Sequence, residues 1–217
     1  MGLCRIRGAG IMTQTIISAD ANNWASIRSV SSGQWSIARA TGESASAYYY
    51  AGINYKLSIY YIHRGVIKFN TSVIGNDEVE SAYLKMALRN EYIDSGNPRY
   101  DVVKITNSNI ATWVADPDSY EDEIYDAILA GTYLNIWQTL NSSPSLNQYL
   151  NSSNLGVDFI NKTGDTWLGV LAYEDRINSE PSVVQYYIDI WTPTSSSYKP
   201  QLIVNHSPVS DLMFWFI

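Results

Sequence analysis

The 217-residue sequence contains one cysteine and two histidines. A single cysteine excludes an intramolecular disulfide and any metal site built from several thiolates. Charged residues make up only 16% of the chain, its net charge is −7, and no segment gathers lysine and arginine into a basic stripe. Because contact with a phosphate backbone needs such a cluster, nucleic acid is excluded as a partner.

Long apolar runs are also missing from the sequence. No run of about 18 apolar residues occurs, so we expect no membrane span. The segment before Asp20 lacks the apolar core that secretory signals have. We therefore expect a chain without a cleavable secretory signal.

The common catalytic motifs are missing as well: the sequence has no G-x-S-x-G, no H-E-x-x-H, no Walker loop and no G-x-G-x-x-G. A Ser-His-Asp arrangement would have to use His63 or His206. The adjacent acids Glu174 and Asp175 would point to opposite sides of an extended run. We therefore expect no enzymatic activity, and glycan cleavage by a pair of carboxylates is the alternative left open.

What the chain does contain is a series of short runs rich in β-branched and aromatic residues, separated by glycine and proline. The pattern predicts an all-β fold, a jelly-roll-like antiparallel β-sandwich with one short helix. The expected strands are 15–18, 24–30, 35–40, 46–51, 56–70, 79–90, 100–106, 133–138, 156–161, 167–172, 185–191 and 201–205. The expected helix is 116–130, capped by Asp116 before Pro117 or by Ser119 paired with Asp122.

Two alternating runs, 61–70 and 79–88, are the clearest part of this pattern. We expect them to be neighbouring antiparallel strands joined by a short polar connection. Arg64 shares a face with Ile62 and Val66, and a buried arginine needs a partner. We expect Arg64 to bind a carboxylate or backbone carbonyls or to lie at an edge; contact with a ligand is the alternative.

The expected organisation is an N-terminal arm (1–14), one β-sandwich domain (15–206) and an apolar C-terminal tail (207–217). The tail ends in LMFWFI, whose exposed aromatic side chains would be a liability. We therefore expect Phe214, Trp215 and Phe216 to pack on the domain or to mediate assembly with another copy.

Neutral hydrogen-bonding groups and 17 tyrosines replace charge in the polar part of the sequence. Consecutive tyrosines in a strand face both sides of a sheet, so some reach the surface and could stack on a sugar ring. The candidate ligand-binding residues are Tyr48, Tyr50, Tyr60 and Arg64. No cofactor is expected, except that loop oxygens could hold a structural calcium ion, with Asp20, Asn76 and Asp77 as candidate ligands.

Four segments together resemble a known family. IHRGVIKFNTSVIG (62–75) and VESAYLKMAL (79–88) resemble the RGLLRFDLSSIP and ITSATLRLY pattern of DNRLRE-type domains, which are related to disaggregatase and to carbohydrate-binding modules. TWLGVLAYEDRINSEP (166–181) and WTPTSSSYKPQLIVNHS (191–207) resemble the late strand and the closing strand. Asn70 departs from the usual Asp, and Asn205-His206 replaces Thr-Tyr.

The resemblance implies an accessory jelly-roll module of cell-surface, secreted or phage virion proteins, and it carries no catalytic residues. We therefore expect a non-enzymatic structural or adhesion module, located on a virion or on the extracellular cell surface, for which glycans are candidate ligands. The alternative is a purely structural subunit of a capsid, tail or filament. Its partners would be other copies of itself or other virion or surface proteins.

Overall fold

The computed structural model of the chain describes residues 5–7, 11–94, 96–141, 143–181, 185–209 and 211–213. Its strands are β1 (Arg5–Arg7), β2 (Thr13–Ser18), β3 (Trp24–Ser29), β4 (Gly42–Ala45), β5 (Tyr49–Lys56), β6 (Ile59–Asn70), β7 (Glu78–Ile93), β8 (Arg99–Ile105), β9 (Thr132–Thr139), β10 (Tyr149–Asn151), β11 (Asp165–Ala172), β12 (Gln185–Ile190), β13 (Gln201–Ser207) and β14 (Asp211–Met213). Its helices are α1 (Trp35–Ala40), α2 (Ile110–Ala115), α3 (Glu121–Leu129) and α4 (Tyr173–Ile177), with short 3₁₀ turns η1 (Ser72–Ile74) and η2 (Pro117–Ser119).

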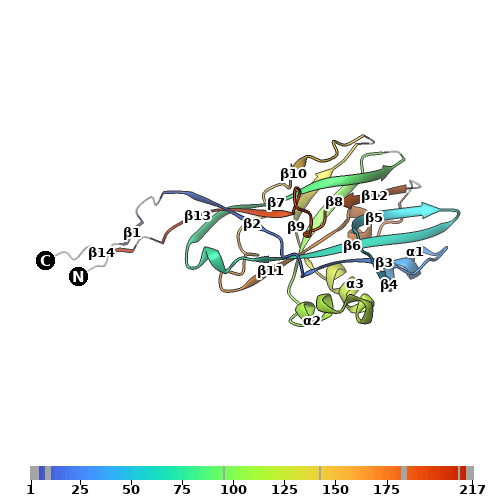
Figure 1. Cartoon of the computed structure of the whole chain (residues 1–217), viewed down its shortest axis with the longest axis horizontal. Coiled ribbons are helices and arrows are strands. Elements are labelled where there is room, and N and C mark those ends of the chain that lie inside the picture. The colour runs from blue at the N-terminus through green and yellow to red at the C-terminus, as the bar shows by residue number, and fades with distance from the viewer. Residues whose placement is uncertain are drawn as a thin grey trace.

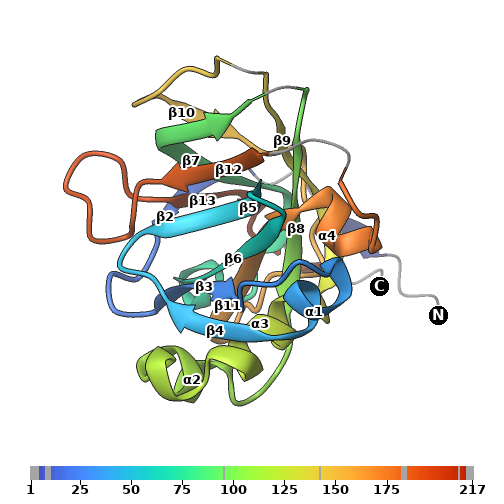
Figure 2. The same ribbon diagram turned by 90° about the vertical axis from the view of Figure 1, so that its right-hand side faces the viewer.

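The fold is all-β and sandwich-like, as the sequence predicts. One curled antiparallel sheet follows the order β2-β13-β7-β12-β5-β6-β11-β8-β9, with β10 paired to β7 and β3 paired to β6 and β4. Figure 1 shows this sheet as the elongated body of the molecule. In Figure 2, α2 and α3 lie on the side away from β10 and β7. The short helices therefore cover only part of the sheet.

The two alternating runs that dominate the sequence pattern form β6 and β7, but the prediction that they are neighbours is wrong. Among the described strands, β6 pairs with β5, β11 and β3, whereas β7 pairs with β13, β12 and β10. The connection between them contains η1 and is longer than a tight hairpin turn. It carries the chain from one part of the curled sheet to another instead of folding it back on itself.

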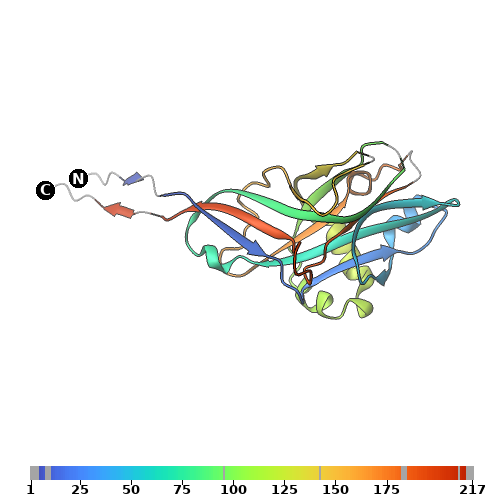
Figure 3. The ribbon, with the colours of Figure 1, turned by 45° about the horizontal axis from the view of Figure 1, so that its top comes forward.

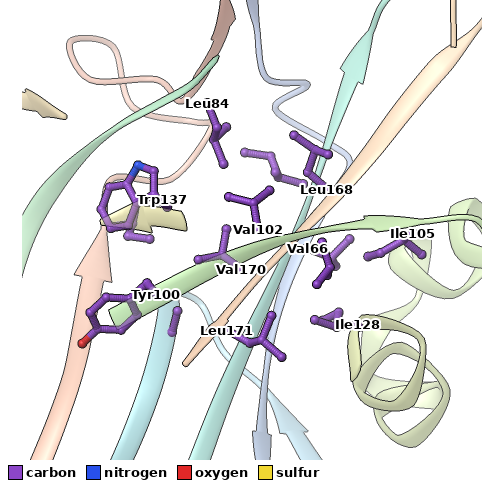
Figure 4. Packing of buried hydrophobic residues seen from close by; sticks show 14 of the residues in the cluster. Val66, Leu84, Tyr100, Val102, Ile105, Ile128, Trp137, Leu168, Val170 and Leu171 are labelled. Atoms are coloured by element: carbon purple, nitrogen blue, oxygen red, sulfur yellow. The ribbon is translucent and has the colours of Figure 1, made fainter. Parts of the chain in front are cut away.

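A single buried apolar cluster fills the space between the curled strands and the helices. Figure 4 shows Val102, Val170 and Leu168 in the middle of this cluster, with Ile128 of α3 beside Val66. These five side chains are fully buried. Replacing Leu168 or Ile128 with alanine would lower the free energy of unfolding by about 2–5 kcal/mol.

The described residues form four helices, where the sequence predicts one. The predicted helix at 116–130 is divided into η2 and α3, and neither Asp116 nor Ser119 caps it with a side-chain hydrogen bond. The carboxylate of Asp122 instead accepts a hydrogen bond from the backbone N–H of Gly42 (2.6 Å), which ties α3 to β4. Tertiary contact with β4 therefore replaces the local capping box.

Two strand predictions are wrong, and a third is right only in part. The run at 35–40 is α1, in which Trp35 and Ala38 are buried one helical turn apart. The run at 156–161 forms turns and bends. The run at 56–70 is interrupted by Leu57 and Ser58, whose positive φ angles (53° and 63°) make the turn between β5 and β6. The aromatic and β-branched residues of these three runs suggest strands, but packing and turn geometry place a helix or turns there instead.

The described parts of the two chain ends run side by side. β1 and β14 pair antiparallel, with Ile6 opposite Leu212, and form a two-stranded sheet of their own. Figures 1 and 3 show this pair at one end of the molecule, beyond β2 and β13. The predicted assembly residues Phe214, Trp215 and Phe216 lie outside the described residues. Within the described part of the chain, no helix has the length and apolarity needed to cross a membrane.

Candidate functional site: an aromatic hollow on the sheet

One row of residues crosses five neighbouring strands at the same level. Tyr92 on β7 is paired with Tyr187 on β12, Tyr187 with Gly52 on β5, Gly52 with His63 on β6, and His63 with Arg28 on β3. Figure 2 shows β12, β5 and β6 in this order. Residues paired across antiparallel strands project from the same face. The row therefore places two tyrosines, a histidine and an arginine together on one face.

The centre of this row carries no side chain, because residue 52 is glycine. Its φ of +125° is a conformation that side-chain-bearing residues rarely adopt, and a Cβ there would meet the carbonyl oxygen of Tyr186. Cα atoms two strands apart are separated by about 10 Å. The rings of His63 and Tyr187 nevertheless approach to 5.4 Å between centroids and stack at 27° across Gly52.

These rings border a hollow of about 210 Å³. It is lined by Arg28, Tyr50, Asn54, Tyr61, His63 and Tyr187. The ring of Tyr50 stands edge-on to both His63 (5.2 Å) and Tyr187 (5.8 Å). We refer to this set of six residues as the aromatic hollow. Its walls combine flat aromatic faces with polar side chains, as in sites that orient small ligands.

Three buried polar atoms of the aromatic hollow have no hydrogen-bond partner within the described structure: Nε of Arg28, Oδ1 of Asn54 and Nδ1 of His63. His63 is only 7% exposed. Its burial, together with the nearby Arg28 charge, lowers its pKa to about 3, so the imidazole is neutral at physiological pH. Buried polar atoms normally have partners, so these three are available to a bound molecule.

Further aromatic side chains extend the site beyond the hollow. The ring of Tyr92 stacks on Tyr187 (4.4 Å, 16°), and Tyr48 lies 5.8 Å from Tyr50. Tyr48 and Tyr92 are 45% and 37% exposed. The guanidinium of Arg89 lies 4.1 Å from the Tyr48 ring centroid. The site therefore continues from the hollow onto an exposed aromatic rim made of Tyr48 and Tyr92.

The structure brings two of the four predicted ligand-binding residues together, Tyr50 in the hollow and Tyr48 on its rim. Tyr60 lies elsewhere: it is 4% exposed, its ring stacks on Tyr55 (4.2 Å), and its hydroxyl donates to Glu180. The next residue, Tyr61, is the one that lines the hollow. Because alternate residues of β6 face opposite sides, Tyr60 points away from the hollow.

Arg64 is a structural residue rather than a ligand contact. Its side chain is completely buried, and its Nε and Nη2 donate to the two carboxylate oxygens of Asp175 (2.7 and 2.8 Å). Its remaining hydrogen bonds go to the backbone oxygens of Tyr125 and Arg39 (3.0 and 2.9 Å). The carboxylate and carbonyl partners expected from the sequence are present. They tie β6 to α1, α3 and α4.

Sequence reasoning missed six residues of the site: Arg28, Asn54, Tyr61, His63, Tyr92 and Tyr187. One signal was available for Tyr187, because the pair Tyr186-Tyr187 must place one ring on each face of a strand. Tyr186 is buried, and Tyr187 takes the outer face. Nothing local to Arg28 or Asn54 connects them to the site, because the strand order brings them together.

The candidate calcium ligands lie in two separate contact networks. Asp20 pairs with Lys68 (3.1 Å) and accepts a hydrogen bond from the backbone N–H of Asn22. This backbone hydrogen bond is the largest cause that lowers the pKa of Asp20. Asp77 contacts Nδ1 of His206 (2.7 Å), and Asn76 beside it is exposed. Among the described residues, no group of three or more His, Cys, Asp or Glu side chains is arranged to hold a metal. The calcium site stays a prediction.

His206 links an acid to a hydroxyl: Asp77 lies at its Nδ1, and the hydroxyl of Thr15 lies 2.8 Å from its Nε2. The order of groups is that of a hydrolase triad. However, His206 is buried between β2, β13 and the loop before β7. We interpret these contacts as a tie that fixes the edge strand β2 to the sheet.

A second hollow, of about 560 Å³, lies where β8 ends and β11 begins, beside α2. Its lining includes Lys104, Asn107, Asp165 and Trp167. Of these two hollows among the described residues, only the aromatic hollow is lined by buried polar atoms without a partner. No protein-family model matches this chain, and no curated protein matches it.

Proposed function

We propose that this protein is a non-enzymatic β-sandwich module that binds glycans at the aromatic hollow and serves as an adhesion or structural component of a virion or cell-surface appendage. The observation that carries the proposal is the conjunction of flat rings with unpartnered buried polar atoms in one hollow. A sugar ring has an apolar face that packs on such rings and hydroxyls that bond to such atoms.

The composition of the whole chain supports an uncharged polar ligand. Charged residues are scarce, tyrosine is abundant, and the net charge is negative. Such a protein has little long-range attraction for polyanions. The location on a virion or cell surface rests on the resemblance of segments such as 62–75 and 166–181 to DNRLRE-type domains.

A glycan array probed with the purified chain tests the proposal. We expect binding to a defined set of glycans, reduced at least tenfold by Tyr50→Ala and by Tyr187→Ala. Tyr133→Ala is the matched control, because this tyrosine on β9 is 40% exposed and outside the aromatic hollow. Binding to no glycan would refute the proposal. Release of reducing sugars from a bound polysaccharide would refute its non-enzymatic part.

A second candidate function is self-assembly as a structural subunit. It is favoured by the β1–β14 pair, which presents two strands beyond the body of the domain, and by the edge strand β2, whose Ile16 is 52% exposed. Exposed edges and apolar strands are templates for pairing with another copy. Deleting residues 208–217 should lower the mass measured by light scattering. An unchanged oligomeric state would count against this candidate.

A further inference from the structure

We infer that the aromatic hollow selects a single uncharged sugar unit, through a group on that unit that both donates and accepts hydrogen bonds; this inference rests on the proposed function. Two sources supply such a group: the vicinal hydroxyls of a hexose and the acetamido group of an N-acetylhexosamine. Carboxylate-bearing sugars, such as uronic acids, are disfavoured.

The first argument is the opposite hydrogen-bonding character of two unpartnered atoms. Nε of Arg28 can only donate, whereas Oδ1 of Asn54 can only accept. A carboxylate only accepts, so a carboxylate that bonds to Arg28 supplies no donor to the Asn54 oxygen; a uronate satisfies both atoms only by presenting its hydroxyls there and keeping its carboxylate out of the hollow. A buried unsatisfied group weakens a complex strongly, which is how polar sites discriminate between ligands. A hydroxyl pair or an amide satisfies both atoms.

The second argument concerns charge. Arg28 is the one side chain of the hollow's lining that carries a charge at neutral pH, since His63 is held neutral by burial. Glu43 lies 3.7 Å from Nη2 of Arg28, and both side chains of this pair are partly exposed. A ligand carboxylate would have to share Arg28 with the like charge of Glu43, whereas an uncharged ligand meets no such repulsion.

The third argument is size. The hollow has a volume of about 210 Å³. This volume lies below the range of sites for drug-sized ligands. It suits one sugar unit set against the edges of the His63 and Tyr187 rings, whose faces are stacked on each other. Neighbouring units of a longer glycan would extend toward the rim at Tyr48 and Tyr92.

Titration calorimetry with three classes of oligosaccharide tests the inference on the unmodified chain. The probes are neutral hexose oligomers, N-acetylhexosamine oligomers and oligouronates of matched length. We expect at least one uncharged class to bind at least tenfold more tightly than the oligouronates, and the tighter of the two uncharged classes identifies the recognised group. Oligouronates that bind as tightly as the uncharged sugars would overturn the inference and leave glycan binding intact. Failure of all sugars to bind would instead refute the proposed function.

A pair of matched variants locates the selectivity. Asn54→Leu removes the acceptor at similar volume, and we expect it to weaken binding of the uncharged sugar about tenfold. Asn22→Leu is the control, because Asn22 is exposed in the loop before β3 and does not line the hollow. Equal affinities of both variants for the uncharged sugar would overturn the role of Asn54. Unchanged thermal unfolding of each variant verifies that the fold is intact.

Discussion

The pair formed by Arg64 and Asp175 allows a sharp test of how the helices are attached to the sheet. Both side chains are completely buried, and two hydrogen bonds of 2.7 and 2.8 Å join them. The guanidinium also lies 3.5 Å from the Tyr125 ring centroid. Asp175→Asn keeps the size of the side chain and removes its charge. Arg64 then stays buried without the carboxylate that pairs with it.

The expected cost follows from the burial of this cation. Breaking a buried pair by removing one partner destabilises a protein by about 3–5 kcal/mol, because the remaining charge is still desolvated. Arg39, whose Nε lies 3.5 Å from Asp175, adds a second positive group to the same place. A loss near the upper end of this range is therefore expected, a large fraction of the roughly 5–15 kcal/mol that stabilises a typical domain.

Urea unfolding monitored by tryptophan fluorescence measures this loss. With an m-value of about 2–3 kcal/mol/M, the midpoint should fall by about 1.5–2.5 M. Glu43→Gln is the matched control, because the Arg28–Glu43 pair is 42% and 47% exposed at 3.7 Å and should contribute less than about 1 kcal/mol.

The double variant Arg64→Met with Asp175→Asn removes the unpaired charge and should be more stable than Asp175→Asn alone. A loss for Asp175→Asn no larger than that for Glu43→Gln would show that the pair does not hold the helices. A double variant less stable than both single variants would refute the charge argument.

Three further predictions concern His63, Gly52 and Thr71. Burial, and after it the Arg28 charge, lowers the pKa of His63 from 6.5 to about 3, so the unfolded chain binds more protons than the folded chain between these pH values. The free energy of unfolding is therefore fully present above pH 6.5 and falls by about 2 kcal/mol from pH 7 to pH 5. His63→Gln should lack this loss when urea unfolding is measured at both pH values. Gly52→Ala should lower the melting temperature more than Gly156→Ala does. Both glycines have a positive φ, but only at Gly52 does a backbone oxygen stand where the Cβ would lie. Equal decreases in melting temperature would contradict this reason. Thr71→Val should cost about 1–3 kcal/mol in urea unfolding, because the buried hydroxyl bonds to Thr166 (2.7 Å) and to two backbone oxygens, and a loss below about 0.5 kcal/mol would count against it.

Local pattern was sufficient for many strands because alternation of apolar and polar residues is a property of neighbours in sequence. The runs at 100–106, 133–138 and 167–172 became β8, β9 and β11 with small shifts of their ends. The partner class of Arg64 was also foreseeable, since a cation between Ile62 and Val66 on a buried face requires an acceptor. Its particular partner, Asp175, stands 111 residues away, and no local rule selects it.

Other features depended on contacts that no local pattern contains. Trp35 and Ala38 belong to a helix because they pack on the sheet together, although the aromatic and isoleucine content of that run favours a strand. The strands β6 and β7 share the clearest alternation in the chain, yet alternation states which face is buried and not which strand is adjacent.

The sequence by itself determined the all-β class, most of the strands, the scarcity of charge, and the presence of tyrosines that must reach the surface. The tertiary structure alone decided the candidate site. Arg28, Gly52, His63, Tyr92 and Tyr187 come from five strands, and they form one row only because the strand order and register align them. The physical reason is that the period of a strand fixes the face of each residue locally, whereas register is set by the packing of the whole sheet.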